Sequence, residues 1–369
     1  MKKEELLCYL GFSHFLGIGP IKFSLLKKHF GSTKKAYFAD RNILNKLIGQ
    51  KLTAKFIDFR NEFDPVKKIR ELEKKDIKII TIDDDNYPLS LKNIPDPPIC
   101  IYLKGEIPHF FKMSNKSTPI LFAIVGTRSP THYGIEITKI FSYRLAKAGF
   151  IIVSGLANGV DTVAHRYCLN AKGRTVAVLG CGVDIVYPAS NRYLYNEIIS
   201  SGGAIISEFP PGQLVQKGLF IARNRIISAL SQGVMVVEGS EDSGSLITAR
   251  YAAEQGKDVF APPSPITSKM SLAPNLLLKQ GAKLVTSAED ILDEYNVKIT
   301  FKNIEEIKSK LNTDEKKFFE LLEKKPLRID DISLSLKEPV SKVLNIVSIM
   351  EIKGIIDRNS DNQYQIKAA

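Results

Sequence analysis

Between residues 119 and 285 the sequence alternates short β-rich runs with helical runs, and this alternation limits the fold more than any other feature. Residues 119–126 and 150–155 have the pattern of buried strands, and residues 133–149 between them have helical spacing and end at a glycine. Further strands follow, with helices expected at 160–173, 191–200, 219–231, 244–255 and 273–280. Such alternation produces βαβ units with right-handed crossovers, so we expect an α/β protein with an extended, Rossmann-like, mostly parallel sheet.

The segments on either side have other patterns. In the N-terminal segment, Gly17-Ile18-Gly19-Pro20 separates two apolar runs and suggests a helix-hairpin-helix (SAM-like) domain, in which the glycines would allow the turn its unusual backbone dihedrals. A plain helical hairpin would show the same pattern. The C-terminal segment has three short helical patterns and two β-rich runs around a polar turn, which is the layout of a winged helix. We therefore expect three domains: a helical domain (1–75), a Rossmann-like domain (76–297) and a winged-helix domain (305–369).

The charge of the chain is concentrated at its N-terminus. The formal net charge is +12, of which residues 1–75 carry +9, residues 76–300 carry +2 and residues 301–369 carry +1. An excess of positive charge favours a polyanionic partner. Any anion site in the middle of the chain must come from a local cluster of side chains and backbone amides, because no broad positive field supports it.

The cysteines and the apolar runs exclude several classes of protein. Cys8, Cys100, Cys168 and Cys181 lie far apart and contain no C-x-x-C pair, so neither a zinc site nor a redox motif is indicated. Neither a signal-peptide core nor an uncharged run long enough to span a bilayer is present. We expect a cytoplasmic protein with reduced cysteines, no membrane association, no metal and no cofactor.

Small and basic residues follow the predicted strands of the central region. Gly126, Thr127 and Arg128 come after the first strand, and Ser154 and Gly155 come after the second. The carboxyl ends of parallel strands lie along one edge of a sheet, so these residues should share one rim. Small residues let a phosphate approach the backbone, and Arg128 offers a planar fork of donors. The alternative is that these glycines serve only the geometry of the turns.

The segment KGLFIARNR combines cations with an aromatic ring. It contains Lys217, Phe220, Arg223, Asn224 and Arg225. Single-stranded nucleic acid is bound through cations on its backbone and aromatic rings on its bases, which makes this combination a candidate site. A core position for Phe220 is the alternative.

Two helix N-terminal elements add candidate anion contacts. Ser243, Gly244, Ser245 and Thr248 begin a predicted helix and could bind a phosphate of DNA or of a nucleotide. In the N-terminal hairpin we expect secondary contacts from Gly17, Gly19 and Lys22.

Seven blocks of the sequence resemble the DprA/Smf (DNA-processing protein A) family in order and spacing. They are IVGTRSPTHYG, VSGLANGVDTVAH, VAVLGCGVDIVYPASN, SGGAIISEFPPG, FIARNRIISALSQGVMVVEG, SGSLITARYAAEQGKDVFAPP and NLLLKQGA. The resemblance covers roughly residues 76–290 and implies a Rossmann domain that binds single-stranded DNA, a homodimer, and a role in loading the RecA recombinase during natural transformation. The chain departs from the family pattern at Ala261-Pro262-Pro263 and Ala273-Pro274-Asn275, away from the candidate DNA residues.

An enzyme on the same fold is the rival hypothesis. A phosphoribohydrolase of the lysine-decarboxylase-like type has the signature P-G-G-x-G-T-x-x-E, and the comparable loop at 243–250 lacks its carboxylate. Asp161, His165 and Cys168 could share a helix face as a metal or catalytic cluster, but Asp161 occupies an expected N-cap position and no further ligand is near in the sequence. We therefore predict a protein that binds DNA and catalyses no reaction.

A leucine-rich segment suggests where the homodimer would form. Leu272, Leu276, Leu277 and Leu278 crowd a short predicted helix at the end of the Rossmann-like domain. One face can pack on the sheet and the remainder is available to a second subunit, unless adjacent loops of the same chain cover it.

Overall fold

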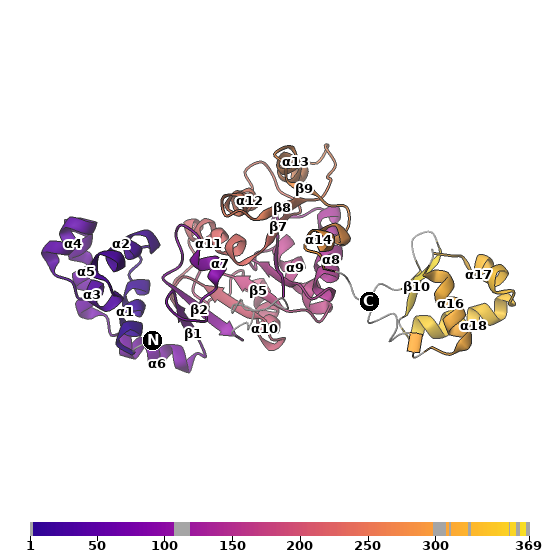
Figure 1. Cartoon of the computed structure of the whole chain (residues 1–369), viewed down its shortest axis with the longest axis horizontal. Helices are drawn as coiled ribbons and strands as arrows, with labels where there is room; N and C mark the ends of the chain where they lie inside the picture. The colour runs from indigo at the N-terminus through magenta and orange to yellow at the C-terminus, as the bar shows by residue number, and fades with distance from the viewer. Residues whose placement is uncertain are drawn as a thin grey trace. The chain divides into compact units, whose positions relative to one another are not determined.

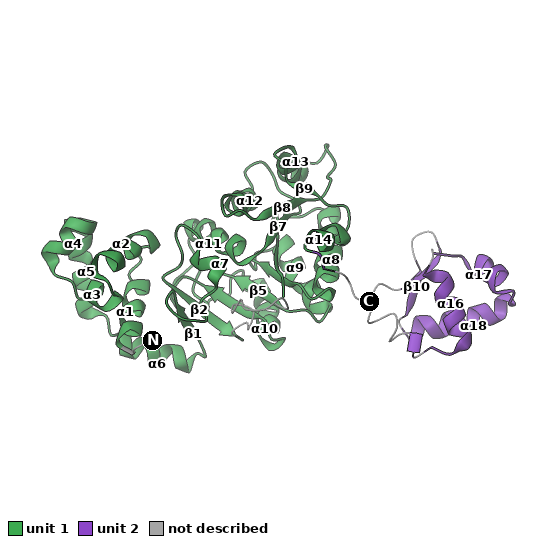
Figure 2. Cartoon of the chain, viewed as in Figure 1, with its two compact units in different colours: residues 1–295 green, residues 296–369 purple. Residues whose placement is uncertain are grey.

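The computed structural model describes residues 3–106, 119–297, 308–309, 311–323, 326–353, 355–358 and 362–366. The chain forms two compact units, residues 1–295 and residues 296–369 (Figure 2). The predicted helical and Rossmann-like domains both lie within the first unit, and their separation near residue 75 stays a prediction. The predicted start of the third domain, residue 305, lies outside the described residues.

One large sheet organises the first unit (Figure 1). In the described part of the chain its nine strands have the order β1-β2-β6-β5-β4-β3-β7-β8-β9. All pairings from β6 to β9 are parallel, while β1 pairs with β2 and β2 with β6 in the antiparallel sense, so the expected mostly parallel α/β sheet is confirmed. The strands are β1 (Lys78–Thr81), β2 (Cys100–Gly105), β3 (Leu121–Val125), β4 (Ile151–Ser154), β5 (Thr175–Val178), β6 (Ala204–Ser207), β7 (Gly233–Val236), β8 (Asp258–Ala261) and β9 (Lys283–Leu284).

Helices alternate with these strands, as the sequence predicts. The predicted helix near residues 219–231 begins two residues earlier in the structure, and the helix at 288–294, which begins at a capping box of Ser287 and Asp290, was not predicted. The helices are α7 (Leu89–Lys92), α8 (His132–Lys147), α9 (Val160–Asn170), α10 (Arg192–Ser200), α11 (Lys217–Leu230), α12 (Gly244–Glu254), α13 (Leu272–Lys279) and α14 (Ala288–Glu294).

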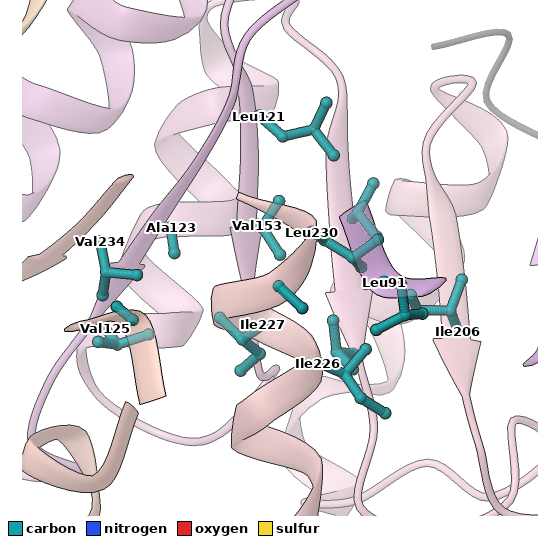
Figure 3. Close-up of a cluster of buried hydrophobic side chains, with 14 of the residues drawn as sticks. Leu91, Leu121, Ala123, Val125, Val153, Ile206, Ile226, Ile227, Leu230 and Val234 are labelled. Atoms are coloured by element: carbon teal, nitrogen blue, oxygen red, sulfur yellow. The ribbon is translucent and has the colours of Figure 1, made fainter. Parts of the chain in front are cut away.

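Helix α11 is fixed against one face of the sheet by a hydrophobic cluster (Figure 3). Its Ile226, Ile227 and Leu230 are buried among side chains of the central strands. Burial of each such side chain contributes about 1.5–3 kcal/mol. Since the sheet side of this helix is immobilised by packing, the residues of its first two turns are held near the carboxyl ends of the strands. The strand residues labelled in Figure 3 are Leu121, Ala123, Val125, Val153, Ile206 and Val234.

The N-terminal segment is helical and shares a core with the sheet. Leu10 and Leu72 pack in one cluster with Tyr102 of β2, and the hydroxyl groups of Ser13 and Tyr102 are 2.6 Å apart. The helices are α1 (Lys3–His14), α2 (Pro20–Phe30), α3 (Thr33–Tyr37), α4 (Arg41–Ile48), α5 (Gln50–Glu62) and α6 (Pro65–Lys74).

The glycines of the N-terminal hairpin do not serve the conformational purpose expected from the sequence. Gly19 is the N-cap of α2 with φ −76°, and Gly17 is not among the residues with positive φ. A Cβ atom on Gly17 would lie 2.8 Å from the Phe15 ring and 2.9 Å from Leu52, so close packing is what requires this glycine. The expectation of unusual backbone dihedrals at these glycines was wrong.

The second unit contains three helices and a two-stranded antiparallel sheet among its described residues. Its core includes Phe318, Phe319, Val343 and Val347. The elements are α16 (Thr313–Leu322), α17 (Ile329–Leu336), α18 (Val340–Ile352), β10 (Ile356–Arg358) and β11 (Tyr364–Ile366). Residues 359–361 of the polar turn predicted between the two β-rich runs lie outside the described residues. In the described parts of both units, no helix is long and apolar enough to cross a membrane.

Candidate nucleic-acid interface

A pocket of about 330 Å³ lies where the strand order of the sheet changes direction. From β3 the chain first adds β4, β5 and β6 on one side, and then β7, β8 and β9 on the other. Ligands of open α/β sheets bind at such switch points, beyond the carboxyl ends of the strands. Many of the residues predicted from separate segments meet here: Gly126, Thr127, Arg128, Arg223, Asn224, Ser243, Gly244, Ser245 and Thr248 all line the pocket.

The loop after β3 is held by the end of β7. The amide of Thr127 donates to the Glu238 carbonyl at 2.8 Å, and the buried Glu238 carboxylate accepts from the amide and the hydroxyl of Thr131 at 2.8 and 2.6 Å. Gly159, at φ +80°, has no room for a side chain because a Cβ atom would lie 2.4 Å from the Thr127 carbonyl oxygen. These contacts fix the backbone from which the exposed Arg128 side chain extends.

Arg223 lines the pocket from α11 and is itself buried. Its Nη1 donates to the carbonyl oxygens of Val178 and, at 2.8 Å, of Gly155. Burial lowers the pKa of Arg223 to about 10, which still leaves the side chain cationic at neutral pH. A Cβ atom on Gly155 would lie 2.6 Å from this guanidinium, so Gly155 is needed for the approach of Arg223. The positive charge is therefore held in a fixed place beneath the rim.

Phe220 brings the two arginines together. Its ring centroid lies 5.5 Å from the Arg128 guanidinium carbon and 5.9 Å from that of Arg223, within the range of cation–π contacts. Phe220 is half-buried, so it is not one of the fully buried core residues among those that the structure describes. Lys217, at the first position of α11, is exposed and does not line the pocket.

Arg225 does not face the pocket, and this corrects the grouping made from the sequence. Its guanidinium forms two hydrogen bonds with the Glu208 carboxylate, at 2.8 and 2.7 Å, and one with Asp96 at 2.7 Å, and only 5% of its side chain is exposed. Residues two apart on a helix point to different faces, so Arg223 and Arg225 could not both reach one site. Arg225 is a buried structural cation without a free donor face for a phosphate.

Ser154 is also absent from the pocket lining. Its side chain is fully buried, and its hydroxyl donates to the Ile124 carbonyl at 2.7 Å across the sheet. The last residue of a strand points to one face of the sheet and not beyond its end, which explains why a residue at the correct position in the sequence still lies below the rim.

The structure adds pocket residues that the sequence did not indicate as ligands. Ser240 and Asp242 come from the loop after β7, where the Ser240 hydroxyl donates to Asp242 at 2.6 Å and lowers the pKa of that carboxyl. Ala157 and Asp161 come from the loop and helix after β4. Ser240 follows the end of strand β7, which is the available sequence signal for it, whereas Asp242 has none.

Asp161 has a different structural role from the one expected. The N-cap of α9 is Gly159, and Asp161 lies inside the helix, where its carboxylate accepts from the amides of Gly155 and Ala157 at 3.1 and 3.3 Å. Desolvation raises the pKa of Asp161, although the neighbouring Arg223 opposes this shift. Asp161 therefore shapes the loop after β4 while one side of it faces the pocket.

The neighbours of Asp161 on α9 have partners inside the fold. His165 Nδ1 lies 2.7 Å from the Thr175 hydroxyl, and Cys168 donates to the Arg174 carbonyl. Burial lowers the pKa of His165 to about 3. Among the described residues, no group of three or more His, Cys, Asp or Glu side chains is arranged to hold a metal ion. The three hairpin residues Gly17, Gly19 and Lys22 also lie outside the pocket, and Lys22 is exposed on α2.

The fold and the pocket define a doubly wound α/β protein with a cationic, amide-lined site at the switch point of its sheet. The family model of DNA recombination-mediator protein A matches residues 78–296, and the chain belongs to this family.

Relatives with assigned names agree with this membership. Protein Smf of Synechocystis sp. is 40% identical over 295 residues, which cover 79% of this chain and 73% of the relative. DNA processing protein DprA of Bacillus subtilis is 43% identical over 218 residues, or 59% of this chain and 71% of the relative.

Two solved structures are similar as well. The X-ray structure of DNA processing protein A from Streptococcus pneumoniae has a TM-score of 0.67 and 32% identity, and the match covers 79% of this chain and 98% of that one. A structure of DNA processing protein A from Helicobacter pylori, which concerns the single-stranded DNA binding mode of that protein, has a TM-score of 0.53 and 31% identity over 59% of this chain and 95% of that one.

Proposed function

We propose that this protein binds single-stranded DNA in the pocket at the switch point and catalyses no reaction. The observation that carries the proposal is the convergence of Arg128, Arg223 and the N-terminus of α12 on one pocket, beside the ring of Phe220. Cations and amides suit the phosphates of a strand, and an aromatic ring suits its bases. The single-stranded DNA binding described for the Helicobacter pylori protein supports this choice of ligand.

Each part of the pocket has a task in this proposal. Arg128 and Arg223 contact phosphate oxygens, and Ser243, Gly244 and Ser245 offer amides and hydroxyls at the positive end of the α12 dipole. Phe220 contacts a base, and Lys217 attracts the backbone on its way out of the pocket. The hairpin with Gly17, Gly19 and Lys22 is a secondary contact.

We further propose the biological setting that the family suggests. The protein protects single strands and helps to load the RecA recombinase in natural transformation and homologous recombination. It acts as a homodimer formed through the C-terminal part of the Rossmann-like domain. On the same basis, residues 1–75 are a helix-hairpin-helix (SAM-like) domain, and residues 305–369 are a winged-helix domain.

The test is a salt-titrated comparison of the affinity for a single strand and for a duplex of equal length. We expect tighter binding to the single strand at every salt concentration and little dependence on base sequence. Equal affinities for both forms would show generic attraction by a basic protein and would refute the proposal.

A nucleotide-using enzyme is a second candidate, and the structure gives it one supporting observation. Although the loop at 243–250 has no carboxylate, Asp242 immediately before it and Asp161 of α9 line the same pocket. A phosphoribohydrolase would release a free base from a nucleoside 5′-monophosphate. We expect no release when the protein is incubated with each of the common monophosphates and the products are separated by chromatography, and release of any base would favour the enzyme.

A further inference from the structure

An exposed tyrosine continues the aromatic surface of the pocket. Tyr187, in the loop between β5 and α10, lies with its ring centroid 5.6 Å from that of Phe220, and the two ring planes are tilted by 42°. Tyr187 is 43% exposed, whereas Phe220 is half-buried. Among the described residues, Tyr187 is thus a solvent-exposed ring in direct contact with the Phe220 ring beside the pocket.

The surroundings of Phe220 limit how much of its ring a base could cover. The guanidinium groups of Arg128 and Arg223 lie within 6 Å of its centroid, at 5.5 and 5.9 Å. On another side Gly180 packs so closely that a Cβ atom there would lie 2.8 Å from Cδ1 of Phe220. The two cations and Gly180 therefore cover part of the Phe220 ring, which limits it to one base, and the neighbouring nucleotide needs another aromatic surface for stacking.

We propose that Tyr187 is a base-stacking residue, which receives the nucleobase adjacent to the nucleotide whose phosphate lies at Arg128. Two neighbouring rings 5.6 Å apart can serve successive nucleotides of one strand, whose rise is about 3.4 Å when fully stacked and larger when the strand is extended. This inference rests on the proposed binding of single-stranded DNA and assigns a second base position to the same site.

The first experiment separates stacking from charge. Affinities for a short oligothymidylate are measured over a range of salt concentrations for the wild type, Tyr187→Ala, Tyr187→Phe and the control Tyr193→Ala, which removes a tyrosine on α10 that is 79% exposed. Stacking on one aromatic residue changes affinity by about 5- to 150-fold, so Tyr187→Ala should lose that factor and Tyr187→Phe should lose none. The slope of log affinity against log salt should stay unchanged in Tyr187→Ala, because no phosphate contact is removed.

The second experiment observes the ring itself. The natural chain has no tryptophan, so Tyr187→Trp introduces a single tryptophan whose emission can be excited apart from that of the tyrosines, and Tyr193→Trp is the matched control. Addition of oligothymidylate should quench the emission of the Tyr187→Trp protein and leave that of the Tyr193→Trp protein unchanged. Addition of an abasic strand of the same length should quench the emission of neither protein.

The outcomes distinguish this inference from the function on which it rests. Wild-type affinity in Tyr187→Ala, together with the absence of quenching in Tyr187→Trp, would overturn the stacking role while single-stranded DNA binding stands. A loss in Tyr187→Ala accompanied by a lower salt slope would overturn it as well, because the residue would then act through the phosphate contacts. Failure of the wild type to prefer single strands would refute both the inference and the proposed function.

Discussion

The carboxylate of Glu208, at the end of β6, depends on Arg225 for its charge. Burial raises the pKa of Glu208, and Arg225 opposes this shift through two hydrogen bonds. For Arg225 itself burial disfavours the charge, yet its pKa is raised by Glu208 and then by Asp96. The pair joins α11 to the carboxyl end of β6, so it fixes the helix that carries Phe220 and Arg223.

Loss of Arg225 should therefore cost stability. Arg225→Ala leaves Glu208 buried without its partner, and breaking a buried ion pair costs about 3–5 kcal/mol of the free energy of unfolding. The loss should shrink as the pH falls through the raised pKa of Glu208, since protonation removes the buried charge. Urea unfolding at several pH values measures this. The control Arg250→Ala, which breaks an exposed pair with Glu254, should cost under about 1 kcal/mol, and an equally small loss in Arg225→Ala would contradict the prediction.

Arg128, unlike the buried Arg225, is exposed, so its removal should leave the hydrophobic core unchanged. Arg128→Ala should weaken single-strand binding uniformly across base sequences and lower the salt slope by about one phosphate contact. Filter-binding or fluorescence-anisotropy titrations at several salt concentrations measure the affinity and its salt slope. Arg166→Ala, an exposed arginine of α9 outside the pocket, serves as the control. An unchanged slope in Arg128→Ala would place the phosphate contacts elsewhere.

For the individual residues of the candidate site, the sequence predicted which segments meet but not in which direction each side chain points. Arg128 and Ser243 were found because they follow strands, and the ends of parallel strands share an edge. Arg225 was grouped with Arg223 although residues two apart on a helix point to different faces, and which of the two arginines turns away from the pocket depends on the acid at position 208, which no local pattern reveals. Tyr187 was missed because contact between rings 33 positions apart in the chain is a product of the fold.

The elements of the sheet domain followed from sequence more closely than its functional side chains. Parallel strands buried on both faces are continuous apolar runs, and their helices end at glycines or turns, so both have strong local signals. The order of the strands has no such signal. The antiparallel addition of β1 and β2 beside β6 joins segments about 100 residues apart, and no local pattern predicts such a pairing.

The lysines in and just after helix α18 of the second unit are paired with carboxylates, which disfavours binding of a nucleic acid to this helix. Its Lys342 is paired with Glu338 and Asp314, and Lys353, just beyond its end, is paired with Glu315. Exposed apolar side chains, Leu344 and Ile349 among them, occupy its outer surface.

Removal of residues 296–369 should leave most single-strand affinity in place, since the proposed site lies wholly in the first unit. Anisotropy titrations of the truncated and the full chain with one oligonucleotide measure this. A loss of nearly all binding would assign the main site to the second unit.

Removal of residues 1–75 would not test binding in the same way, because it would also disturb the fold of the sheet. Leu10 and Leu72 pack in one cluster with Tyr102 of the sheet, and their loss would expose that core.

At the scale of the whole molecule, the structure shows which side chains of α13 are exposed and could form the interface of the proposed dimer. On α13, Leu277 is buried and Leu278 packs against the same core, whereas Leu272 and Leu276 are exposed one turn apart. The two departures from the family pattern lie next to this helix: the Asn275 side chain donates to the Ser264 carbonyl at 3.3 Å, and Tyr133 donates to the Pro263 carbonyl. The loop is therefore tied to the helix, and on α13 the exposed pair Leu272 and Leu276 is the apolar surface that a second subunit could contact.

Leu276→Asp should convert the dimer into a monomer, because a carboxylate at the centre of an apolar contact must be buried without a partner. Light scattering at tens of micromolar protein gives the mass, and Leu334→Asp, on an exposed leucine of the second unit, is the control. Two sites on one particle let a long strand engage both, so the monomer should lose affinity for a long oligonucleotide and keep it for one that fills a single pocket. A wild-type protein that is monomeric both with and without DNA would refute the dimer. A Leu276→Asp protein that remains dimeric would instead place the interface away from α13.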